Sequence, residues 1–223
     1  MALSGFHEVI ERAGAAAERV DRSRDEITLV AVSKGRTVDQ IRELYELGHR
    51  DFGENRAAEM AEKVPQLPED IRWHYVGMLQ SNKARLVRDQ THLLHSMDRV
   101  SLAKSWLKGI GEPPPVMLQV NVGREEQKGG ALPEDVSTLA ARFVAMGLEV
   151  RGLMAIPPLG ESAEESRPYF SALRELRDEL RVELPTVDGL SMGMTNDFEV
   201  AIEEGASFIR VGRAIFESTV DRD

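Results

Sequence analysis

Short apolar runs alternate with amphipathic segments along most of the chain. Eight runs, each bounded by turn-forming residues, have the length and the content of β-branched and aromatic residues that are typical of strands buried on both faces. These runs are residues 27–33, 50–53, 72–77, 92–97, 116–121, 149–155, 186–192 and 208–211. The segments between them include helical patterns, as in 37–47, where Ile41, Leu44 and Leu47 recur at helical spacing.

The order of these elements predicts the fold class. Helices are expected over 4–24, 37–47, 133–146, 163–184 and 195–204. Alternating strands and helices indicate a parallel sheet with helical crossovers, and eight such units close into a barrel. We therefore expect an α/β protein made of one (β/α)8 TIM-type barrel over residues 1–223, with an extra N-terminal helix.

An open doubly wound sheet is the alternative fold, but no G-x-G-x-x-G turn follows the first strand, where the chain reads Ser33-Lys34-Gly35-Arg36-Thr37. The stretch 109–115, rich in glycine and proline, is short and directly precedes a strand. It is expected to be a loop within the barrel and not a boundary between two domains.

Composition narrows the functional classes. The formal net charge of −10 disfavours a nucleic-acid binder, which needs a basic face. The absence of cysteine excludes disulfides and thiolate chemistry, and residues 1–20 lack the apolar run of a signal peptide or membrane span. The five histidines are scattered without a metal-ligand spacing. We therefore expect a cytoplasmic protein with no metal site and no partner among membranes or nucleic acids.

Active residues of such barrels gather where the strands end, so the strand ends carry the candidate chemistry. Lys34 directly follows the first apolar run. A lysine there is either a solvated surface charge or an amine that forms a Schiff base with an aldehyde. Asn55, after the second strand, is either a helix cap or an amide that faces a ligand. Lys83, farther along, fits a plain surface charge.

The seventh and eighth strands end in small-residue turns. Residues 191–197 read Ser-Met-Gly-Met-Thr-Asn-Asp, and 210–213 read Arg-Val-Gly-Arg. Free backbone N–H groups at such turns bind anions, and the loops after these two strands often hold phosphate in TIM barrels. Arg210 would point into a largely apolar barrel and needs an acceptor. That acceptor is either a bound ligand or a buried carboxylate such as Asp188.

Several motifs in order resemble one family, the pyridoxal phosphate homeostasis proteins, whose fold is similar to the barrel domain of alanine racemase. The resemblance covers nearly the whole chain and rests on a set of short strings. They are Ala31-Val32-Ser33-Lys34, Gly53-Glu54-Asn55, Trp73-His74-Tyr75-Val76-Gly77 with Leu79-Gln80-Ser81-Asn82-Lys83, Arg151-Gly152-Leu153-Met154, Leu190-Ser191-Met192-Gly193-Met194, and the segment from Arg210 to Phe216.

The resemblance implies pyridoxal 5′-phosphate (PLP) as the cofactor. By that resemblance, Lys34 forms a Schiff base with PLP, Asn55 lies beside the cofactor, and Arg210 approaches the pyridine nitrogen. An arginine there leaves the ring nitrogen unprotonated and the ring a poorer electron sink. The phosphate is expected in two turns, whose residues are Ser191, Gly193, Met194 and Thr195 in one, and Gly212 and Arg213 in the other.

Three segments depart from the pattern of many relatives. Gly35-Arg36-Thr37 replaces a short polar stretch ending in proline, and Thr195-Asn196-Asp197 stands where Ser-Asp-Asp is common. Both changes suit a phosphate site built from backbone groups. Gln127-Lys128-Gly129-Gly130 replaces a Ser-Lys-x-Gly pattern. No role for a serine of that loop can be carried over to this chain.

Two functional classes follow from the resemblance. A carrier would hold PLP, buffer it and deliver it to PLP-dependent apoenzymes, with no catalytic residue of its own. A weakly active amino-acid racemase is the alternative, and it would need a second acid or base on the opposite ring face. Of the tyrosines, Tyr45 and Tyr169 fall in helices and Tyr75 in a strand. The carrier is favoured, and a monomer is expected.

A third hypothesis is that the barrel binds a phosphorylated ligand other than PLP. Lys34 would then be a simple counterion for another phosphorylated molecule, and no Schiff base would form.

Overall fold

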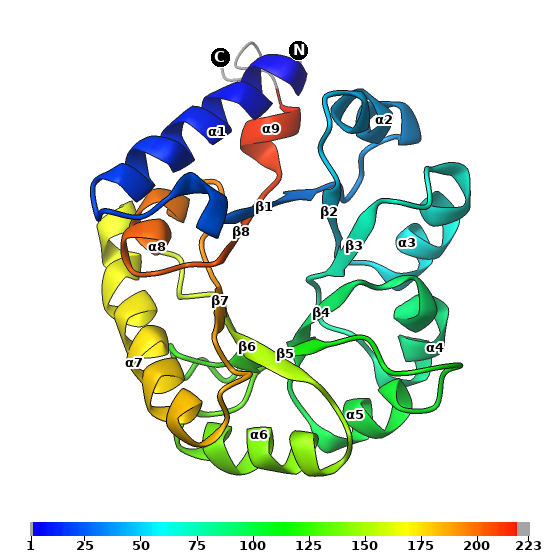
Figure 1. The fold of residues 1–223 in the computed structure, drawn as a ribbon, viewed down its shortest axis with the longest axis vertical. Coiled ribbons are helices and arrows are strands. Elements are labelled where there is room, and N and C mark those ends of the chain that lie inside the picture. The colour runs from blue at the N-terminus through cyan, green and yellow to red at the C-terminus, as the bar shows by residue number, and fades with distance from the viewer. Residues whose placement is uncertain (1, 218–223) are drawn as a thin grey trace.

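Eight parallel strands close into a barrel in the computed structural model, which describes residues 2–217 (Figure 1). Neighbours in the barrel are neighbours in sequence, and β8 pairs with β1 to close the ring. The strands are β1 Thr28–Val32, β2 Asp51–Glu54, β3 Arg72–Tyr75, β4 Leu93–Met97, β5 Val116–Val120, β6 Val150–Ala155, β7 Gly189–Ser191 and β8 Phe208–Val211. All eight predicted strands are confirmed, and the open doubly wound sheet is wrong.

Helices surround the barrel and cover its outer face (Figure 1). They are α1 Ala2–Glu18, α2 Val38–Glu46, α3 Ala57–Lys63, α4 Ala84–Val87, α5 Val100–Trp106, α6 Val136–Ala145, α7 Arg167–Glu183, α8 Phe198–Glu203 and α9 Arg213–Phe216. No helix within the described part of the chain has the length and apolar content needed to cross a membrane.

Several predicted helices have different ends in the structure. Those predicted from 133 and 163 begin with the 3-10 turns Pro133–Asp135 and Ala163–Ser166, ahead of α6 and α7. The helix predicted over 4–24 ends at Glu18, because Asp21 turns the chain in a left-handed conformation and Ser23 caps a separate 3-10 turn, Arg24–Glu26. The helix predicted from 195 begins at Phe198. The Asp197 carboxylate accepts a hydrogen bond from the Met194 N–H, which makes 194–197 a turn ahead of the helix.

Alternation along the strands separates an inner face from an outer face. Phe52 and Trp73 lie on the outer face and belong to the main hydrophobic core between barrel and helices. Gly53 lies on the inner face, where a Cβ atom would stand 2.8 Å from a methyl group of Val30. Inside the barrel, the Phe208 ring lies 5.5 Å from the ring of His95. The interior therefore holds polar side chains as well as apolar ones.

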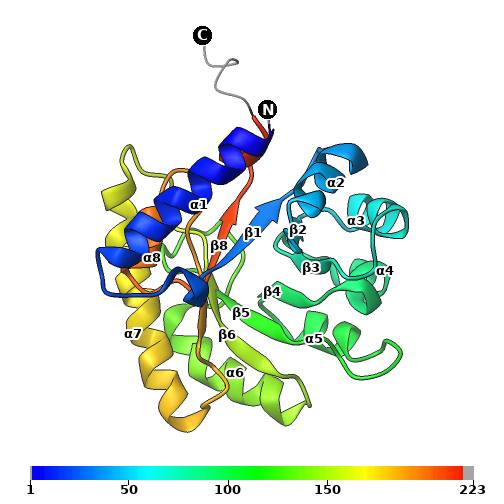
Figure 2. The ribbon, with the colours of Figure 1, turned by 45° about the horizontal axis from the view of Figure 1, so that its top comes forward.

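The N-terminal helix closes the helical layer beside the last one. α1 lies along α8 and α9 (Figures 1 and 2). A Cβ atom at Gly5 would come within 2.3 Å of the Ala214 carbonyl oxygen, so glycine allows α1 and α9 to touch. This contact supports the chain just after β8, where one of the predicted phosphate turns lies.

The stretch 109–115 is a loop between α5 and β5, as predicted. Arg88 is buried beneath it, and its guanidinium donates to the carbonyl oxygens of Trp106, Ile110 and Gly111 at 2.6–2.9 Å. Trp106 also holds the loop, because its Nε1–H donates to the Pro114 carbonyl at 2.9 Å. Residues 2–217 contain one closed barrel, and a single domain over 1–223 stays a prediction.

Candidate functional site

Lys34 lies in a tight turn directly after β1. The turn is closed by a hydrogen bond of 3.0 Å from the Arg36 N–H to the Ser33 carbonyl, and Gly35 takes a left-handed conformation with φ +68°. Val32 pairs with Gly53 on the neighbouring strand. The Lys34 side chain is exposed and makes no hydrogen bond or ion pair with any residue of 2–217. Its amine is therefore available to a ligand at the barrel mouth.

A buried ionic cluster fixes the backbone on both sides of Lys34. The Lys63 ammonium donates to the Ser33 carbonyl at 2.7 Å and to the carboxylates of Glu54 and Glu59 at 2.6 Å each. Glu59 also accepts the Gly35 N–H at 2.5 Å. We call Ser33, Glu54, Glu59 and Lys63 the outer cluster. The sequence reasoning missed it, because Lys63 and Glu59 carry no signal that separates them from surface charges of a helix.

Glu54 is fully buried in the outer cluster, as Ser33 is. Burial raises the pKa of its carboxyl group, while hydrogen bonds from Lys63 and from the Ser33 hydroxyl oppose that rise. One carboxylate oxygen is fully used by these two donors, and the other is buried without a partner within the described residues. The carboxylate is thus held in place from one side only.

Asn55 lies at the end of β2 and is held there through its backbone. The Tyr75 hydroxyl donates to the Asn55 carbonyl at 3.2 Å, and a Cβ atom at Gly77 would come within 2.7 Å of three Asn55 atoms. The helix-cap alternative is wrong, because Arg56 precedes α3 and no side chain caps that helix. The Asn55 side-chain oxygen is buried without a partner among residues 2–217, as expected for an amide that hydrogen-bonds to a ligand.

The turn after β7 brings free backbone N–H groups to the mouth. Gly193 has φ +88°, and a Cβ there would lie 2.5 Å from the Ala201 Cβ, so only glycine fits. The Met194 N–H is used by Asp197 at 2.7 Å. The N–H groups of Thr195 and Asn196 have no partner within the described chain. Two donors of this turn are therefore open to an anion.

The turn after β8 is the second half of the predicted phosphate site. A Cβ at Gly212 would lie 3.0 Å from the Val32 carbonyl oxygen, so this turn packs directly against the end of β1. The N–H groups of Gly212 and Arg213 have no partner among residues 2–217, and the Arg213 side chain is exposed. Arg36 pairs with Glu217 at 2.6 Å, which links the Lys34 loop to the same segment.

Arg210 is buried inside the barrel and bonds to neutral groups. Its guanidinium donates to the Ser191 hydroxyl at 2.6 Å and to the Ala155 carbonyl at 3.0 Å. Burial lowers its pKa to about 10, so it remains a cation at neutral pH. The alternative pairing with Asp188 is wrong: that carboxylate is exposed and pairs with Arg181 at 3.3 Å. Whether Arg210 approaches a pyridine nitrogen stays a prediction.

The Ser191 hydroxyl faces the interior and not the free N–H groups of the turn. It is fully buried and contacts both Arg210 and a ring nitrogen of His95, at 2.7 Å. His95 in turn contacts His74 at 2.8 Å. Sequence reasoning treated these histidines as scattered. A usable signal was present, because successive side chains of a strand point to opposite faces. His74 and His95 each follow a residue that faces outward, on the adjacent strands β3 and β4, so the alternation predicts that both face the interior.

Within the described residues, no group of three or more His, Cys, Asp or Glu side chains is arranged to hold a metal ion.

The loop 127–130 is held by Lys128 near the neighbouring β6–α7 loop. The Lys128 ammonium donates to the Pro157 carbonyl at 2.8 Å and pairs with Glu125, and the Gln119 amide donates to the Gly129 carbonyl at 3.0 Å. These contacts order the loop without a serine.

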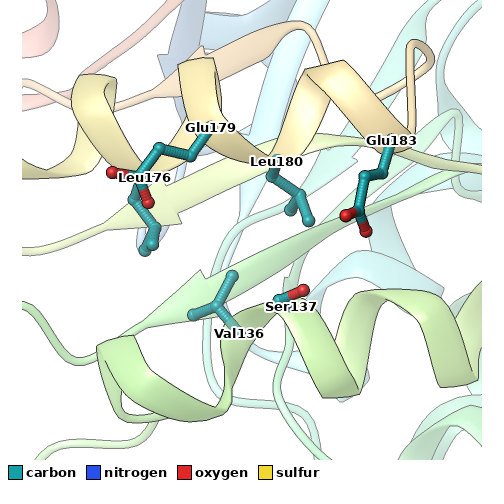
Figure 3. Close-up of a pocket in the computed structure, with 6 residues that line it drawn as sticks. All are labelled: Val136, Ser137, Leu176, Glu179, Leu180 and Glu183. Carbon is teal, nitrogen blue, oxygen red and sulfur yellow. The ribbon is translucent and has the colours of Figure 1, made fainter.

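A surface groove lies between α6 and α7 (Figure 3), and none of the strand-end residues described above lines it. Leu176 and Leu180 point from α7 toward Val136 and Ser137 on α6, and the carboxylates of two glutamates, Glu179 and Glu183, border it (Figure 3). The six described residues that line the groove include no basic side chain, so a phosphorylated ligand does not suit it.

Comparisons with known proteins agree with this geometry. The family model of the alanine racemase N-terminal domain matches residues 13–219. A pyridoxal phosphate homeostasis protein of Aquifex aeolicus is 42% identical over 216 residues, covering 93% of this chain and 94% of that protein. A protein of the same name from Pseudomonas aeruginosa is 41% identical, covering 93% of this chain and 91% of its own length.

Solved structures with similar folds include one that has PLP bound. PipY of Synechococcus elongatus with PLP bound is 35% identical, with a TM-score of 0.78 over 93% of this chain and 99% of that one. The same protein without PLP has a TM-score of 0.82 at the same coverage. This single barrel, with its lysine after β1 and its two glycine turns after β7 and β8, belongs to the pyridoxal phosphate homeostasis protein family.

Proposed function

We propose that this protein binds PLP through a Schiff base with Lys34 and serves intracellular PLP homeostasis by buffering or delivering the cofactor. The observation that carries the proposal is an unpartnered Lys34 amine on the same rim as two turns with free N–H groups, in a chain 35% identical to a relative with PLP bound. The amine attacks the PLP aldehyde, a C=N bond forms, and one water molecule leaves.

The other residues bind and orient the cofactor. Thr195 and Gly212 contribute backbone N–H groups from their turns to the phosphate, and Arg213 is an exposed cation directly after Gly212. The orphaned Asn55 oxygen accepts a hydrogen bond from the cofactor side. Arg210 faces the ring as a donor that does not readily give up its proton. Bound in this way, PLP would supply an electrophilic C=N carbon and a weak electron sink.

Carriage is favoured over racemisation because two tyrosines that could serve as a second acid or base are already hydrogen-bonded within residues 2–217. Tyr75 is buried, its hydroxyl is bonded to the Asn55 backbone, and burial raises its pKa to about 12. The Tyr45 hydroxyl donates to Asp70 at 2.8 Å on the outer surface. We therefore propose that bound PLP undergoes negligible turnover with amino acids. Rapid exchange of the α-hydrogen of L-alanine would contradict this part of the proposal.

Absorbance spectroscopy tests the site. Protein incubated with PLP should acquire a visible absorption band that shifts on borohydride reduction, after which mass spectrometry should find the pyridoxyl group on the peptide containing Lys34. Lys34→Ala should lose the band entirely. Lys83→Ala, which removes an exposed lysine from the loop after β3, is the matched control and should keep it. An unchanged band in Lys34→Ala would overturn the site, and noncovalent binding alone would favour the counterion reading.

Delivery and assembly need separate measurements. Activation of a PLP-dependent apoenzyme by the loaded protein, in the presence of a scavenger for free PLP, tests direct transfer. We propose that the protein acts as a monomer in the cytoplasm, and light scattering across a concentration series tests the first part of that statement.

A further inference from the structure

A chain of polar side chains crosses the interior of the barrel beneath the site. It begins at Asp51 on β2, whose carboxylate lies 3.1 Å from His74 Nε2. His74 Nδ1 lies 2.8 Å from His95 Nε2, and His95 Nδ1 lies 2.7 Å from the Ser191 hydroxyl. That hydroxyl accepts from Arg210 at 2.6 Å. We call these five residues the inner chain.

The two ends of the inner chain have fixed hydrogen-bonding roles. Arg210 can only donate. Asp51 can only accept when ionised, and it is ionised because two hydrogen bonds from Arg72, at 2.7 and 2.5 Å, help to hold its carboxylate. Burial favours the neutral acid, yet hydrogen bonds from Arg72 and His74 outweigh it and hold the pKa of Asp51 well below its usual value.

These end conditions determine the direction of each bond between them. A neutral His74 must donate Nε2–H to Asp51, which leaves its Nδ1 as an acceptor for Nε2–H of His95. His95 Nδ1 is then an acceptor as well, and it takes the only hydroxyl proton of Ser191. The Ser191 oxygen is left with lone pairs alone toward Arg210, which agrees with the observed contact.

We propose that Asp51, His74 and His95 are positioning residues for Arg210. Asp51 holds both histidines as neutral Nε2–H tautomers, and His95 turns the Ser191 hydroxyl so that its lone pairs face the guanidinium. The inference deepens the proposed function, because Arg210 is the group expected at the PLP ring. Arg210 is thereby held by neutral acceptors, and no carboxylate among residues 2–217 contacts it. Its remaining N–H groups stay available to a ligand.

The competing arrangement has a doubly protonated His74. That cation would donate from both nitrogens, His95 would become the Nδ1–H tautomer, and the Ser191 oxygen would accept two bonds. It would place a second positive charge inside the barrel with Arg210, where charged groups are poorly solvated. Burial also lowers the pKa of both histidines, that of His95 well below its usual value.

Imidazole ¹⁵N resonances of the full chain, recorded at pH 7 without PLP, test the proton arrangement directly. A nitrogen that carries a proton resonates far from one that does not. We expect one protonated and one unprotonated nitrogen in each ring of His74 and His95, with the proton on Nε2 in both. Two protonated nitrogens in His74, or a proton on Nδ1 of His95, would overturn the proposal whatever PLP does.

Variants of His95 test the consequence for the cofactor. His95→Phe breaks the inner chain and should weaken PLP binding roughly tenfold and shift the visible band, since Arg210 loses its fixed acceptor. His95→Gln can accept through its oxygen and donate through its nitrogen, and it should restore most of the affinity and the band position. His92→Phe is the control: its ring also contacts His74 but makes no hydrogen bond within the described chain.

Equal affinity and an equal band position in His95→Phe and the unmodified protein would refute the positioning role. Equal losses in His95→Phe and His95→Gln would also refute it, because packing and not the hydrogen-bonded chain would then be responsible. Failure of the proposed function is distinguishable, since it would show as loss of the Lys34-dependent band in the unmodified protein.

Discussion

The outer cluster and the inner chain both bury polar groups close to the candidate site, but they hold them in opposite ways. In the outer cluster, the Lys63 ammonium touches two carboxylates at 2.6 Å each. In the inner chain, the Arg210 cation and the Asp51 anion are separated by three neutral side chains. One arrangement is a contact ion pair and the other is a directed series of neutral hydrogen bonds.

The difference corresponds to what each region supports. The outer cluster acts on the backbone of Ser33 and Gly35, on both sides of Lys34, and all three donors of Lys63 are used. The inner chain acts on a side chain that is expected to meet a ligand. A carboxylate in contact with Arg210 would occupy donors that the ligand needs. A buried cation at a binding site is therefore better held by neutral acceptors.

The largest effect is expected from Lys63→Met. The variant leaves Glu54 and Glu59 with no cation beneath the turn, and removing one partner of a buried ion pair lowers the free energy of unfolding by about 3–5 kcal/mol. Urea denaturation measures it. Adding Glu54→Gln to Lys63→Met should recover part of the loss, because the buried charge is removed as well. Lys104→Met, on the exposed face of α5, is the control. A loss below about 1 kcal/mol would show that the outer cluster is not an effective ion pair.

Acid should lower the stability of the folded protein through its neutral histidines, two of which belong to the inner chain. Burial lowers the pKa of His49 from 6.5 to about 4, and it lowers the pKa of His74 and His95 too. Below pH 6.5 the unfolded chain therefore binds more protons than the folded chain. The contribution of these histidines to the free energy of unfolding is fully present above pH 6.5 and falls as the pH is lowered toward 4. Each such histidine contributes about 1.4 kcal/mol per pH unit within its window.

Denaturation curves between pH 8 and pH 4 measure that slope. His49→Phe should flatten it by the share of one histidine, independently of its effect on stability at pH 8. A slope unchanged by that variant would contradict the assignment of a neutral, half-buried His49.

The smallest effect is expected at the rim, where Arg36 pairs with Glu217 across partly exposed side chains. Glu217→Gln should lower the free energy of unfolding by less than about 1 kcal/mol, because solvent screens an exposed pair. PLP affinity should change less than twofold. A larger change in affinity, measured by absorbance titration, would mean that this surface contact shares the positioning role assigned to the two buried regions.

The sequence alone predicted much of this molecule. Strand-length apolar runs separated by helical patterns were enough for the eight-stranded barrel, because hydrophobic periodicity is a local property. The lysine after β1 and the glycine turns after β7 and β8 were found in the same way, since strand ends can be located without knowing which strands meet. Helix ends at 18 and 198 were predicted less well, because side-chain caps and turns decide them.

Only the tertiary structure decided which polar groups meet. His74 and His95 are far apart in sequence from Ser191 and are joined to it only because β4 and β7 face one interior. Arg210 found neutral acceptors instead of Asp188 for the same reason. These hydrogen-bond partners come from strands far apart in the sequence and meet only when the barrel closes. The local hydrophobic pattern therefore does not predict them. The sequence determined the barrel and the place of Lys34, and the closed barrel determined what holds the site around it.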